Sequence, residues 1–487
     1  MKAAQFSDTA RQSAYDAVVV GSGPNGLAAA IELAKADWKV LVVEAHSAPG
    51  GGARSDEGTL PGFVHDVCAA VHPMGVCSPL MKSLPLQDFG LQWEYSKYPL
   101  AHPLDGGQAA IMEASVDATA QRLGAADGKA YRRLYEPLVR DAEGLFADML
   151  GPMLKLPKHL IAAAQFGVRA LPSAMSLARV CFQDEPARAM LAGHAAHSVL
   201  PLDRSPSAAV GLMLAVAGHA AGWPVAKGGT GKISEAMVAY LQSLGGEVVC
   251  GWRVQRLEEL PQAKAYLFDT GPAELAKIAA QRLPEAYRKK LEAYRYGPGV
   301  FKIDYALSEA IPWENEDCRQ AATVHVGGWL DEVVESEKAC WQGRHAEKPF
   351  VLLAQASVCD DTRAPAGKHT AWAYCHVPNG SQVDMTQAIE NQIERFAPGF
   401  RDVVLQRRVM MCADYESYNA NLVGGDVTGG VNDWSQLLAR PALRLNPYTT
   451  PAKGVFICSA STPPGAGVHG MCGYHAARAV LLQGNKS

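Results

Sequence analysis

The sequence predicts an α/β protein with a Rossmann-type dinucleotide-binding domain, and three observations near the N-terminus carry this prediction. Residues 16–20 have the apolar composition of a buried parallel strand and run directly into a glycine-rich turn at residues 21–26. An apolar segment typical of a helix follows. A second apolar strand, residues 39–43, ends at Glu44, 18 residues after Gly26. A dinucleotide-binding unit requires these elements in this order.

The residue types in the turn suit a bound dinucleotide. Gly21 permits the tight turn, Gly23 lets the backbone approach a pyrophosphate, and Gly26 lets the helix pack closely on the strand. The positive N-terminus of the helix faces the phosphates. The carboxylate of Glu44 is placed to accept hydrogen bonds from a ribose. These residues alone are compatible with either NAD or FAD.

Length and composition restrict the class of protein. A chain of 487 residues exceeds one ordinary hydrophobic core, so we expect two packed domains. The net charge of −4 gives no electrostatic reason to expect a nucleic-acid partner. Eleven cysteines without a CxxC pair or metal-ligand spacing indicate free thiols and no metal site. No apolar run reaches about 18 residues, and the first residues lack signal-peptide character, so we expect a cytoplasmic protein.

Segments in the middle and at the end of the chain are predicted to complete the nucleotide-binding sheet. A helix at residues 235–244 is followed by Gly245-Gly246 and then by short apolar stretches. The strands expected to join this sheet are residues 247–250, 253–257, 265–268 and 454–458, and a final helix is expected at residues 471–482.

A second domain is predicted from different patterns. A largely helical stretch covers residues 116–222, and alternating apolar and polar residues predict a half-buried antiparallel sheet. Its expected strands are residues 300–307, 350–357 and 370–377, with a helix at residues 384–396. We therefore predict a discontinuous nucleotide domain of residues 1–60, 223–296 and 438–487, and a substrate domain of residues 61–222 and 297–437.

Four blocks, spread over nearly the whole chain, resemble the flavin-dependent phytoene desaturase and amine oxidase superfamily, and within it the phytoene dehydrogenase-like branch. The resemblance implies a glutathione-reductase-like FAD-binding domain with an inserted α+β substrate domain, in which an antiparallel sheet is combined with helices. The blocks are the N-terminal unit with Gly50-Gly51 and Arg54-Ser55, the segment from Gly228-Gly229 to Val254, residues 424–430 with Arg440-Pro441 and Pro447-Tyr448, and residues 458–473.

The resemblance implies that the cofactor is FAD and assigns residues to it. The glycine turn would hold the pyrophosphate, Val254 would contact the adenine through its backbone, and residues 467–470 would line the flavin ring. A helix that begins at Met471 would aim its positive N-terminus at the flavin and stabilise the charge that arrives with a hydride. The residues expected to bind FAD are Gly21, Ser22, Gly23, Pro24, Asn25, Gly26, Glu44, Ala45, Gly51, Gly52, Arg54, Val254, Gly467, Val468, His469, Gly470 and Met471.

The activity implied by this resemblance is that of an FAD-dependent dehydrogenase, desaturase or oxidase. It would take a hydride from a largely apolar organic substrate, with an isoprenoid or polyene as the first choice. Gly52 stands where amine oxidases usually carry Arg, which favours the desaturase-like branch. No second glycine motif and no redox cysteine pair follow, so we expect oxygen or a quinone as electron acceptor, not NAD(P). A flavin amine oxidase and a non-catalytic flavin-binding interaction protein are the alternatives.

Few titratable residues near the expected flavin offer catalytic chemistry. His469 is the weak candidate, since it either moves a proton or is held by the backbone and turned from the substrate. His65 and His72 follow the block of Gly50-Gly51 and Arg54 and are expected to be structural. Cys458 and Cys472 are expected to be buried small hydrophobes and not sites of flavin attachment. No motif identifies a catalytic base.

Residues 149–183 contain no Asp or Glu and carry four basic residues among many apolar ones. Two interpretations fit this composition. One is a monotopic patch that contacts the inner face of a membrane and admits a lipophilic substrate, and the other is a helical lid with a solvated basic rim. The expected partners are thus a small lipophilic substrate, an electron acceptor and a peripheral membrane contact.

Overall fold

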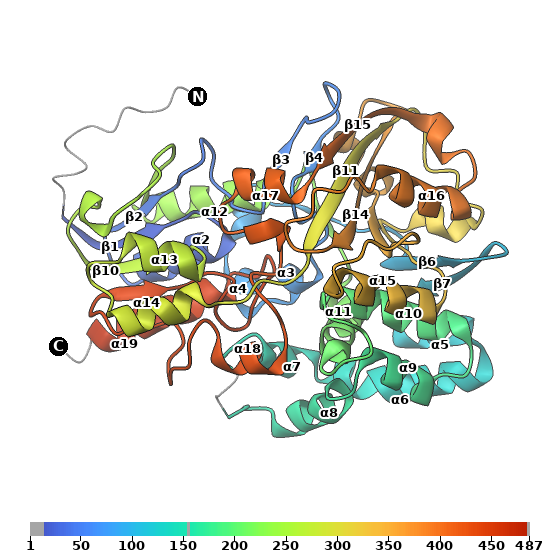
Figure 1. Ribbon diagram of the computed structural model, residues 1–487, viewed down its shortest axis with the longest axis horizontal. Coiled ribbons are helices and arrows are strands. Elements are labelled where there is room, and N and C mark those ends of the chain that lie inside the picture. Colours follow the sequence, from blue (N-terminus) through green and yellow to red (C-terminus); the bar gives the residue numbers. More distant parts are fainter. Residues whose placement is uncertain (1–13, 153–155, 485–487) are drawn as a thin grey trace.

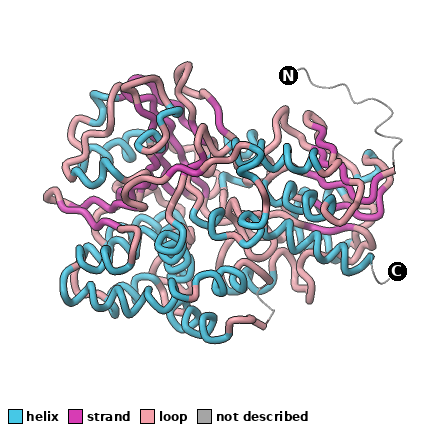
Figure 2. Tube along the Cα trace, turned by 180° about the vertical axis from the view of Figure 1, so that it is seen from behind, coloured by secondary structure: helices cyan, strands magenta, loops and turns pink. Residues whose placement is uncertain are grey.

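The computed structural model describes residues 14–152 and 156–484, and this part of the chain forms two large sheets and two small sheets of two strands each. Figure 1 shows the parallel sheet with α13, α14 and α19 on the left, and the larger sheet with α16 at the upper right, above a layer of helices. The same division into strand-rich and helix-rich layers is visible from behind in Figure 2.

The parallel sheet has five strands in the order β16-β10-β1-β2-β9, and its strands come from three separated stretches of the chain. Ala17 and Val19 of β1 face the core beneath α2, while Val18 and Val20 face the core shared with α13 and α14, so the strand is buried on both sides. The elements are β1 (Tyr15–Val20), α2 (Pro24–Ala34), β2 (Val40–Val43), α12 (Gly231–Ser243), β9 (Glu247–Val249), β10 (Ala263–Phe268), α13 (Pro272–Ile278), α14 (Glu285–Glu292), β16 (Val455–Ile457) and α19 (Met471–Gly484).

One predicted strand of this sheet is wrong. Residues 253–257 form no strand, because Gly251 adopts a φ of 77° and turns the chain away after β9. The Trp252 N–H donates to the carbonyl of Glu44, which holds the turned segment against the end of β2. The apolar residues Val254 and Leu257, which suggested a strand, are buried in the core beside α13.

The larger sheet has seven strands in the order β15-β11-β14-β13-β12-β6-β7 and is antiparallel except for the pair β12 and β6. The three strands predicted by alternation are its centre, and α16 covers one face. Four strands were not predicted: β6, whose His-Pro pair interrupts the pattern, β15, whose edge position carries two arginines, and the short strands β7 and β12. The elements are β6 (Leu100–Leu104), β7 (Gln108–Met112), β11 (Gly299–Leu307), β12 (Thr323–Val326), β13 (Val351–Ala354), β14 (His369–Val377), α16 (Thr386–Phe396) and β15 (Val404–Met410).

The predicted helical stretch consists of seven helices that pack below the larger sheet. These are α5 (Val116–Arg122), α6 (Gly124–Arg140), α7 (Ala142–Met149), α8 (Leu160–Ala170), α9 (Ala174–Cys181), α10 (Glu185–Ala196) and α11 (Ser207–Ala221). In the described part of the chain no single helix has the length and apolar character to cross a membrane. Only α8 and α9 taken together, bent by 96°, meet that test.

Short elements complete the fold around the junction of the two sheets. They are β3 (Ser55–Asp56), β4 (His65–Asp66), α3 (Pro73–Cys77), α4 (Pro79–Ser83), β5 (Trp93–Glu94), β8 (Val225–Ala226), α15 (Leu330–Trp341), α17 (Cys412–Tyr418) and α18 (Trp434–Ala439). The carboxyl ends of β1, β2 and β10 meet at this junction, which is where parallel sheets bind ligands. The domain boundaries given above stay a prediction.

Candidate functional site

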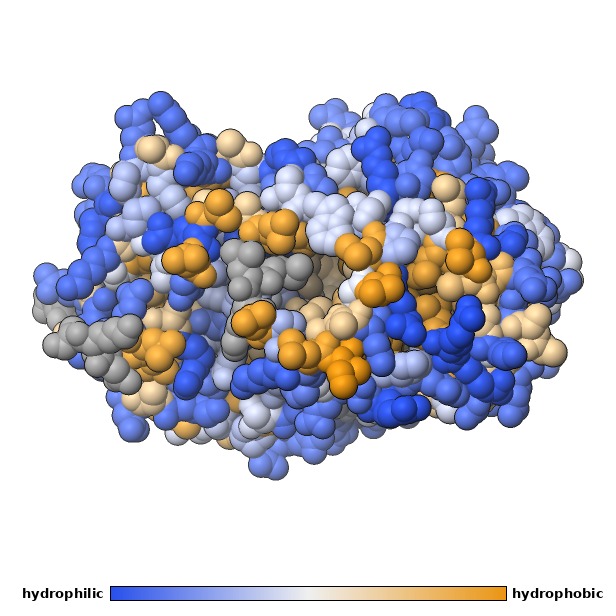
Figure 3. Space-filling model, turned by 90° about the horizontal axis from the view of Figure 1, so that it is seen from below, coloured by the Kyte–Doolittle hydropathy of each residue, from blue (hydrophilic) through white to orange (hydrophobic). Residues whose placement is uncertain are grey.

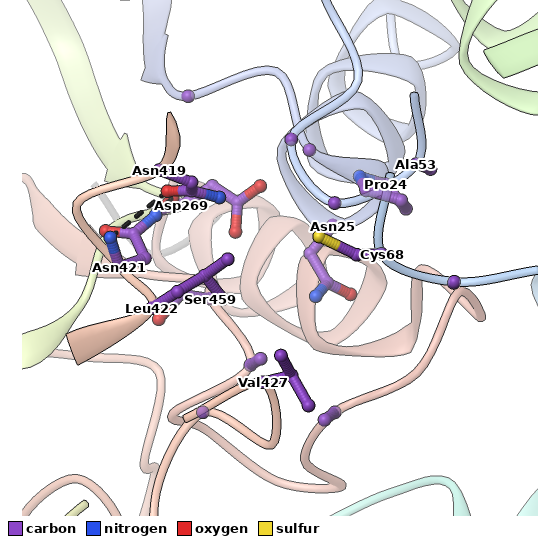
Figure 4. Close-up of a pocket in the computed structure, with 18 of the residues that line it drawn as sticks. Pro24, Asn25, Ala53, Cys68, Asp269, Asn419, Asn421, Leu422, Val427 and Ser459 are labelled. Carbon is purple, nitrogen blue, oxygen red and sulfur yellow. Dashed lines mark hydrogen bonds between the residues drawn. The ribbon is translucent and has the colours of Figure 1, made fainter. Parts of the chain in front are cut away.

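A cavity of about 550 Å³ extends from the carboxyl ends of the parallel strands toward the larger sheet. Figure 4 shows residues from four distant parts of the chain around it, among them Asn25, Cys68, Asp269 and Ser459. Most of the residues predicted to bind a dinucleotide line this cavity. They are Gly21, Ser22, Gly23, Pro24, Asn25, Glu44, Ala45, Gly51, Gly52, Arg54, Val254, Gly467 and Val468.

Glu44 is fixed at the end of β2 by donors on both carboxylate oxygens. The backbone N–H and hydroxyl of Ser22 donate to Oε2 at 2.9 and 2.6 Å. The N–H of His46 donates to Oε1 at 2.8 Å, and the Arg54 guanidinium lies 3.3 Å from the same oxygen. A carboxylate offers about four acceptor positions. Two donors therefore reach each oxygen, which holds the carboxylate of Glu44 in one orientation at the edge of the cavity.

The glycine turn leaves a narrow channel that side chains would fill. A Cβ on Gly51 would lie 2.9 Å from the Cα of Gly23, and a Cβ on Gly23 would lie 2.6 Å from a carboxylate oxygen of Asp269. Gly26 lies behind the channel, where a Cβ would overlap the Gly21 carbonyl oxygen. This cradle at the N-terminus of α2 fits a pyrophosphate, so the residues present fit the dinucleotide end of FAD.

Asp269, at the end of β10, is a site residue that the sequence analysis did not single out. Its carboxylate accepts a hydrogen bond of 2.9 Å from the Gly26 N–H, and the Asn421 side chain donates to its backbone carbonyl at 3.3 Å (Figure 4). Burial, followed by the nearby charge of Glu44, raises the pKa of Asp269 to about 7. An acid that follows a strand was visible in the sequence, but only the pairing of β10 with β1 places it at the glycine turn.

The C-terminal loop reaches the cavity with residues 459–461 and 466–468, so Gly467 and Val468 are the predicted residues of this loop that line it. His469 is buried, and its Nδ1 accepts a hydrogen bond of 3.1 Å from the N–H of Met471, so its ring caps the start of α19. Burial lowers the pKa of His469 to about 4. A Cβ on Gly470 would meet Leu80 and α2, so this glycine serves the packing of α19 against α2. His469, Gly470 and Met471 are described residues that do not line the cavity.

The other titratable residues named from the sequence are held by structural contacts. His72 lines the cavity, but its Nε2 lies 2.8 Å from the Thr230 hydroxyl and burial lowers its pKa to about 4. His65 Nε2 lies 2.7 Å from the Thr59 hydroxyl, away from the cavity lining. Cys458 and Cys472 are fully buried, and burial raises both thiol pKa values. Both cysteines are packed as small hydrophobic residues, as the sequence predicted.

The far end of the cavity is apolar and was not recognisable in the sequence. Leu214 and Trp223 reach it from the helical layer, and Leu352 and Trp372 from the larger sheet. His197 is the polar group here, and its Nε2 lies 3.0 Å from Nε2 of the buried His325. Burial lowers the pKa of His197 to about 3, which keeps the ring neutral. The described residues at this end include no carboxylate.

Comparisons with known proteins agree with this geometry. The family model of the NAD(P)-binding Rossmann-like domain matches residues 19–83. The chain is 24% identical to pyridine nucleotide-disulfide oxidoreductase domain-containing protein 2 of Rattus norvegicus, over 96% of this chain and 93% of the relative. It is 26% identical to the lycopene-forming phytoene desaturase of Paracoccus sp. (strain N81106 / MBIC 01143), over 96% and 97%. A solved structure of putrescine oxidase bound to putrescine is 15% identical, with a TM-score of 0.60 over 97% of this chain and 100% of the oxidase.

The two sequence relatives confirm the predicted resemblance to the phytoene desaturases, and the putrescine oxidase structure shows a shared fold. The Rossmann-like match and the shared fold confirm the predicted fold class. The relatives' names state oxidoreductase and desaturase, in agreement with the predicted enzyme class, and the Rossmann-like match agrees with the predicted FAD. The roles assigned to single residues stay predictions.

Proposed function

We propose that this protein is an FAD-dependent oxidoreductase that takes a hydride from a largely apolar organic molecule. The observation that carries the proposal is the continuity of one cavity, which joins the dinucleotide cradle at Gly23 and Glu44 to an apolar chamber at Leu214 and Trp223. Such a cavity brings the reacting end of a bound cofactor and the substrate into one dry space.

The residues of the cradle would bind the cofactor, and FAD, when bound, supplies the acceptor for the hydride. The N-terminus of α2 would stabilise the negative pyrophosphate, and Glu44, which lines the cavity at the end of β2, would bind the ribose. The N-terminus of α19, beside Gly467 and Val468, lies next to the start of α2 and adds a second positive dipole on this side of the cavity.

The apolar chamber supports an uncharged substrate, with an isoprenoid or polyene as the first choice. Its walls exclude water and position the substrate by shape, since they offer few polar contacts. An ammonium substrate would find no carboxylate among the described residues of this end. This favours a desaturase or dehydrogenase over an amine oxidase, which is the alternative. Oxygen or a quinone is proposed as the electron acceptor.

The test is spectroscopic and uses the purified protein. A bound flavin, released by denaturation and identified as FAD by chromatography, is expected. After photoreduction, air or a soluble quinone should restore the yellow absorbance, whereas NADH or NADPH should not bleach the oxidised protein. Rapid bleaching by NADH would contradict the proposed acceptor. A flavin that neither air nor quinone reoxidises would support the non-catalytic interaction protein instead.

A further inference from the structure

A cluster of histidines lies behind the apolar chamber and has no part in the proposed chemistry. Its members come from β6, from the end of α10 and from β12, and they are His102, His194, His197 and His325. The ring centroid of His325 lies 5.0 Å from that of His197, 5.6 Å from that of His194 and 6.4 Å from that of His102. The indole of Trp223, which lines the chamber, lies 5.6 to 5.9 Å from three of these rings. The cluster and the chamber therefore share a wall.

The fold makes room for the histidine cluster at a glycine. A Cβ on Gly193 of α10 would lie 2.6 Å from Nδ1 of His325 and 2.9 Å from Nδ1 of His102. A side chain at this position would therefore displace both rings from a close-packed core. His102 and His325 are fully buried, so they are hidden from the underside of the molecule, where Figure 3 shows hydrophobic residues around a hollow.

Burial keeps these rings neutral and leaves some of their nitrogen atoms unpaired. It lowers the pKa of His102 and of His194 to about 4, and that of His325 well below its usual value. Nε2 of His102 donates to the Gly328 carbonyl and Nδ1 of His194 donates to the Met190 carbonyl, both at 2.7 Å. The second nitrogen of each of these two rings, and Nδ1 of His325, have no partner among the described residues. In the same part of the chain, no three His, Cys, Asp or Glu side chains converge as a metal site requires.

His197 connects the histidine cluster to the chamber. Its ring lines the cavity, and its Nε2 lies 3.0 Å from Nε2 of His325. Because both rings are neutral, one of these two nitrogens donates and the other accepts. No residue of the described ranges forms a hydrogen bond with Nδ1 of His197, so this nitrogen is left for a molecule in the chamber.

The surroundings of His325 indicate which nitrogen of His197 carries the proton. If Nε2 of His325 accepted, the proton of that ring would sit on Nδ1, as a buried N–H that no described residue accepts. If Nε2 of His325 donates, its Nδ1 keeps only an unused lone pair. Buried N–H groups are orphaned more rarely than buried acceptors, which favours the second arrangement. The proton of His197 then sits on Nδ1, and the ring offers the chamber one N–H donor.

We propose that Nδ1 of His197 binds an uncharged oxygen of the substrate, so that the substrate is an apolar molecule with a hydroxyl or carbonyl group. This inference rests on the proposed function, because it takes the chamber as the substrate site. A pure hydrocarbon leaves the N–H of His197 unsatisfied, and a carboxylate loses its water for a single neutral donor. One polar contact in an apolar chamber selects the uncharged oxygen and fixes the orientation of the molecule that carries it.

The experiment is a competition measurement at equilibrium, which needs no turnover. Farnesol and farnesene, an isoprenoid alcohol and a hydrocarbon with chains of equal length, displace diphenylhexatriene from the purified protein, and fluorescence gives both affinities. His197→Gln and His197→Met have side chains of similar size, and only the first offers an N–H. In His197→Met the affinity for farnesol relative to farnesene should fall about tenfold, because the hydroxyl is left unpaired. In His197→Gln this ratio should stay within about threefold of wild type.

Tyr374→Phe is the control, because Tyr374 also lines the cavity. It packs nearer the middle, against the cluster that contains Val300 and Tyr415, and no described residue forms a hydrogen bond with its hydroxyl. The farnesol-to-farnesene ratio should be unchanged in this variant. A fall as large as that in His197→Met would overturn the inference, and so would equal ratios in His197→Met and His197→Gln. The melting temperature and the flavin absorbance show that each variant is folded.

A second measurement needs no change at His197 and so does not depend on the folding of a variant there. The infrared carbonyl stretch of bound farnesal should lie below its frequency in hexane, in the wild-type protein and in Tyr374→Phe, because a hydrogen bond weakens the C=O bond. An unchanged frequency would overturn the inference, as would failure of farnesol and farnesal to bind. The proposed function fails in a different way, through the absence of FAD or through a flavin that is not reoxidised. A protein that passes those flavin tests and fails these binding tests refutes the role of His197 alone.

Discussion

The two ends of the main cavity are built in different ways. The dinucleotide end is defined by backbone, where Gly23 and Gly51 leave room that any side chain would occupy. The apolar end is defined by side chains, among them Leu214 from a helix and Leu352 from a strand. A site made by backbone tolerates almost no change and leaves glycines in the sequence. A site made by apolar side chains tolerates change and leaves no motif.

The largest expected effect is that of Gly26→Ala, at the backbone-defined end. A Cβ there would overlap the Gly21 carbonyl oxygen and approach Asp269, so we expect destabilisation of about 3 kcal/mol and loss of flavin. The measurements are the melting temperature and the flavin content. Gly167→Ala in α8 is the control, since nothing lies within 4 Å of its Cβ, and it should stabilise the protein by about 0.5 kcal/mol.

Glu44→Ala removes a carboxylate that holds the dinucleotide end together. The ribose contact is lost and Arg54 is left without its carboxylate, so FAD affinity should fall about 50-fold, as expected when a charged hydrogen-bond acceptor is removed. Titration of the apoprotein with FAD measures this. Glu247→Ala provides the comparison, because Glu247 accepts from Tyr15 at the sheet edge; equal losses in the two variants would argue against a ribose contact.

Leu214→Asn changes the apolar end of the cavity and tests whether the two ends bind their ligands independently. An amide in the apolar wall should weaken binding of diphenylhexatriene, an uncharged polyene probe, about tenfold, because the polar group stays unsatisfied. FAD affinity should not change. Fluorescence titration of the probe gives the first quantity and flavin absorbance the second. A variant that loses FAD together with the probe would show that the ends are not independent.

Asp269 makes the dinucleotide end sensitive to pH. Its pKa is raised from 3.8 to about 7, so the neutral carboxyl is favoured in the folded protein. Its contribution to apoprotein stability is therefore present below pH 4 and is lost as the pH rises through about 7. The anionic pyrophosphate also favours the neutral form, so FAD affinity should fall about fivefold from pH 6 to pH 8. Asp269→Asn should remove both dependences, and a pH-sensitive variant would contradict the assignment.

The smallest effect is expected for His469→Ala. Its ring caps α19 and does not line the cavity, so turnover and its pH profile should stay within about twofold of wild type, while stability falls by about 1 kcal/mol from the lost cap. Steady-state kinetics over pH and thermal melts measure the two. If the variant has normal stability but a shifted pH profile of turnover, His469 takes part in catalysis after all.

The sequence predicts the strands of the parallel sheet better than those of the larger sheet. The reason is the same as for the two ends of the cavity, since a local pattern marks one and distant neighbours determine the other. The strands β1, β2 and β16 are buried on both faces, so they appear in the sequence as short apolar runs, and the second half of β10 has the same character. The segment at residues 253–257 has a similar composition but is turned away at Gly251. In the larger sheet, β6 and β15 carry Pro103, Arg407 and Arg408, and their pairing depends on neighbours distant in the chain.

The sequence by itself determined the dinucleotide end and the resemblance, because glycine spacing encodes backbone approach and needs no knowledge of distant contacts. Only the tertiary structure placed Asp269 at the glycine turn, turned His469 into the cap of α19, and assembled the apolar chamber. Asp269 meets Gly26, and Leu214 meets the same cavity as Leu352, across more than a hundred positions, whereas His469 caps a helix that begins two residues later. The residues of the site that come from distant parts of the chain acquire a function because they lie close together. That closeness follows from strand order and helix packing, which no local sequence pattern encodes.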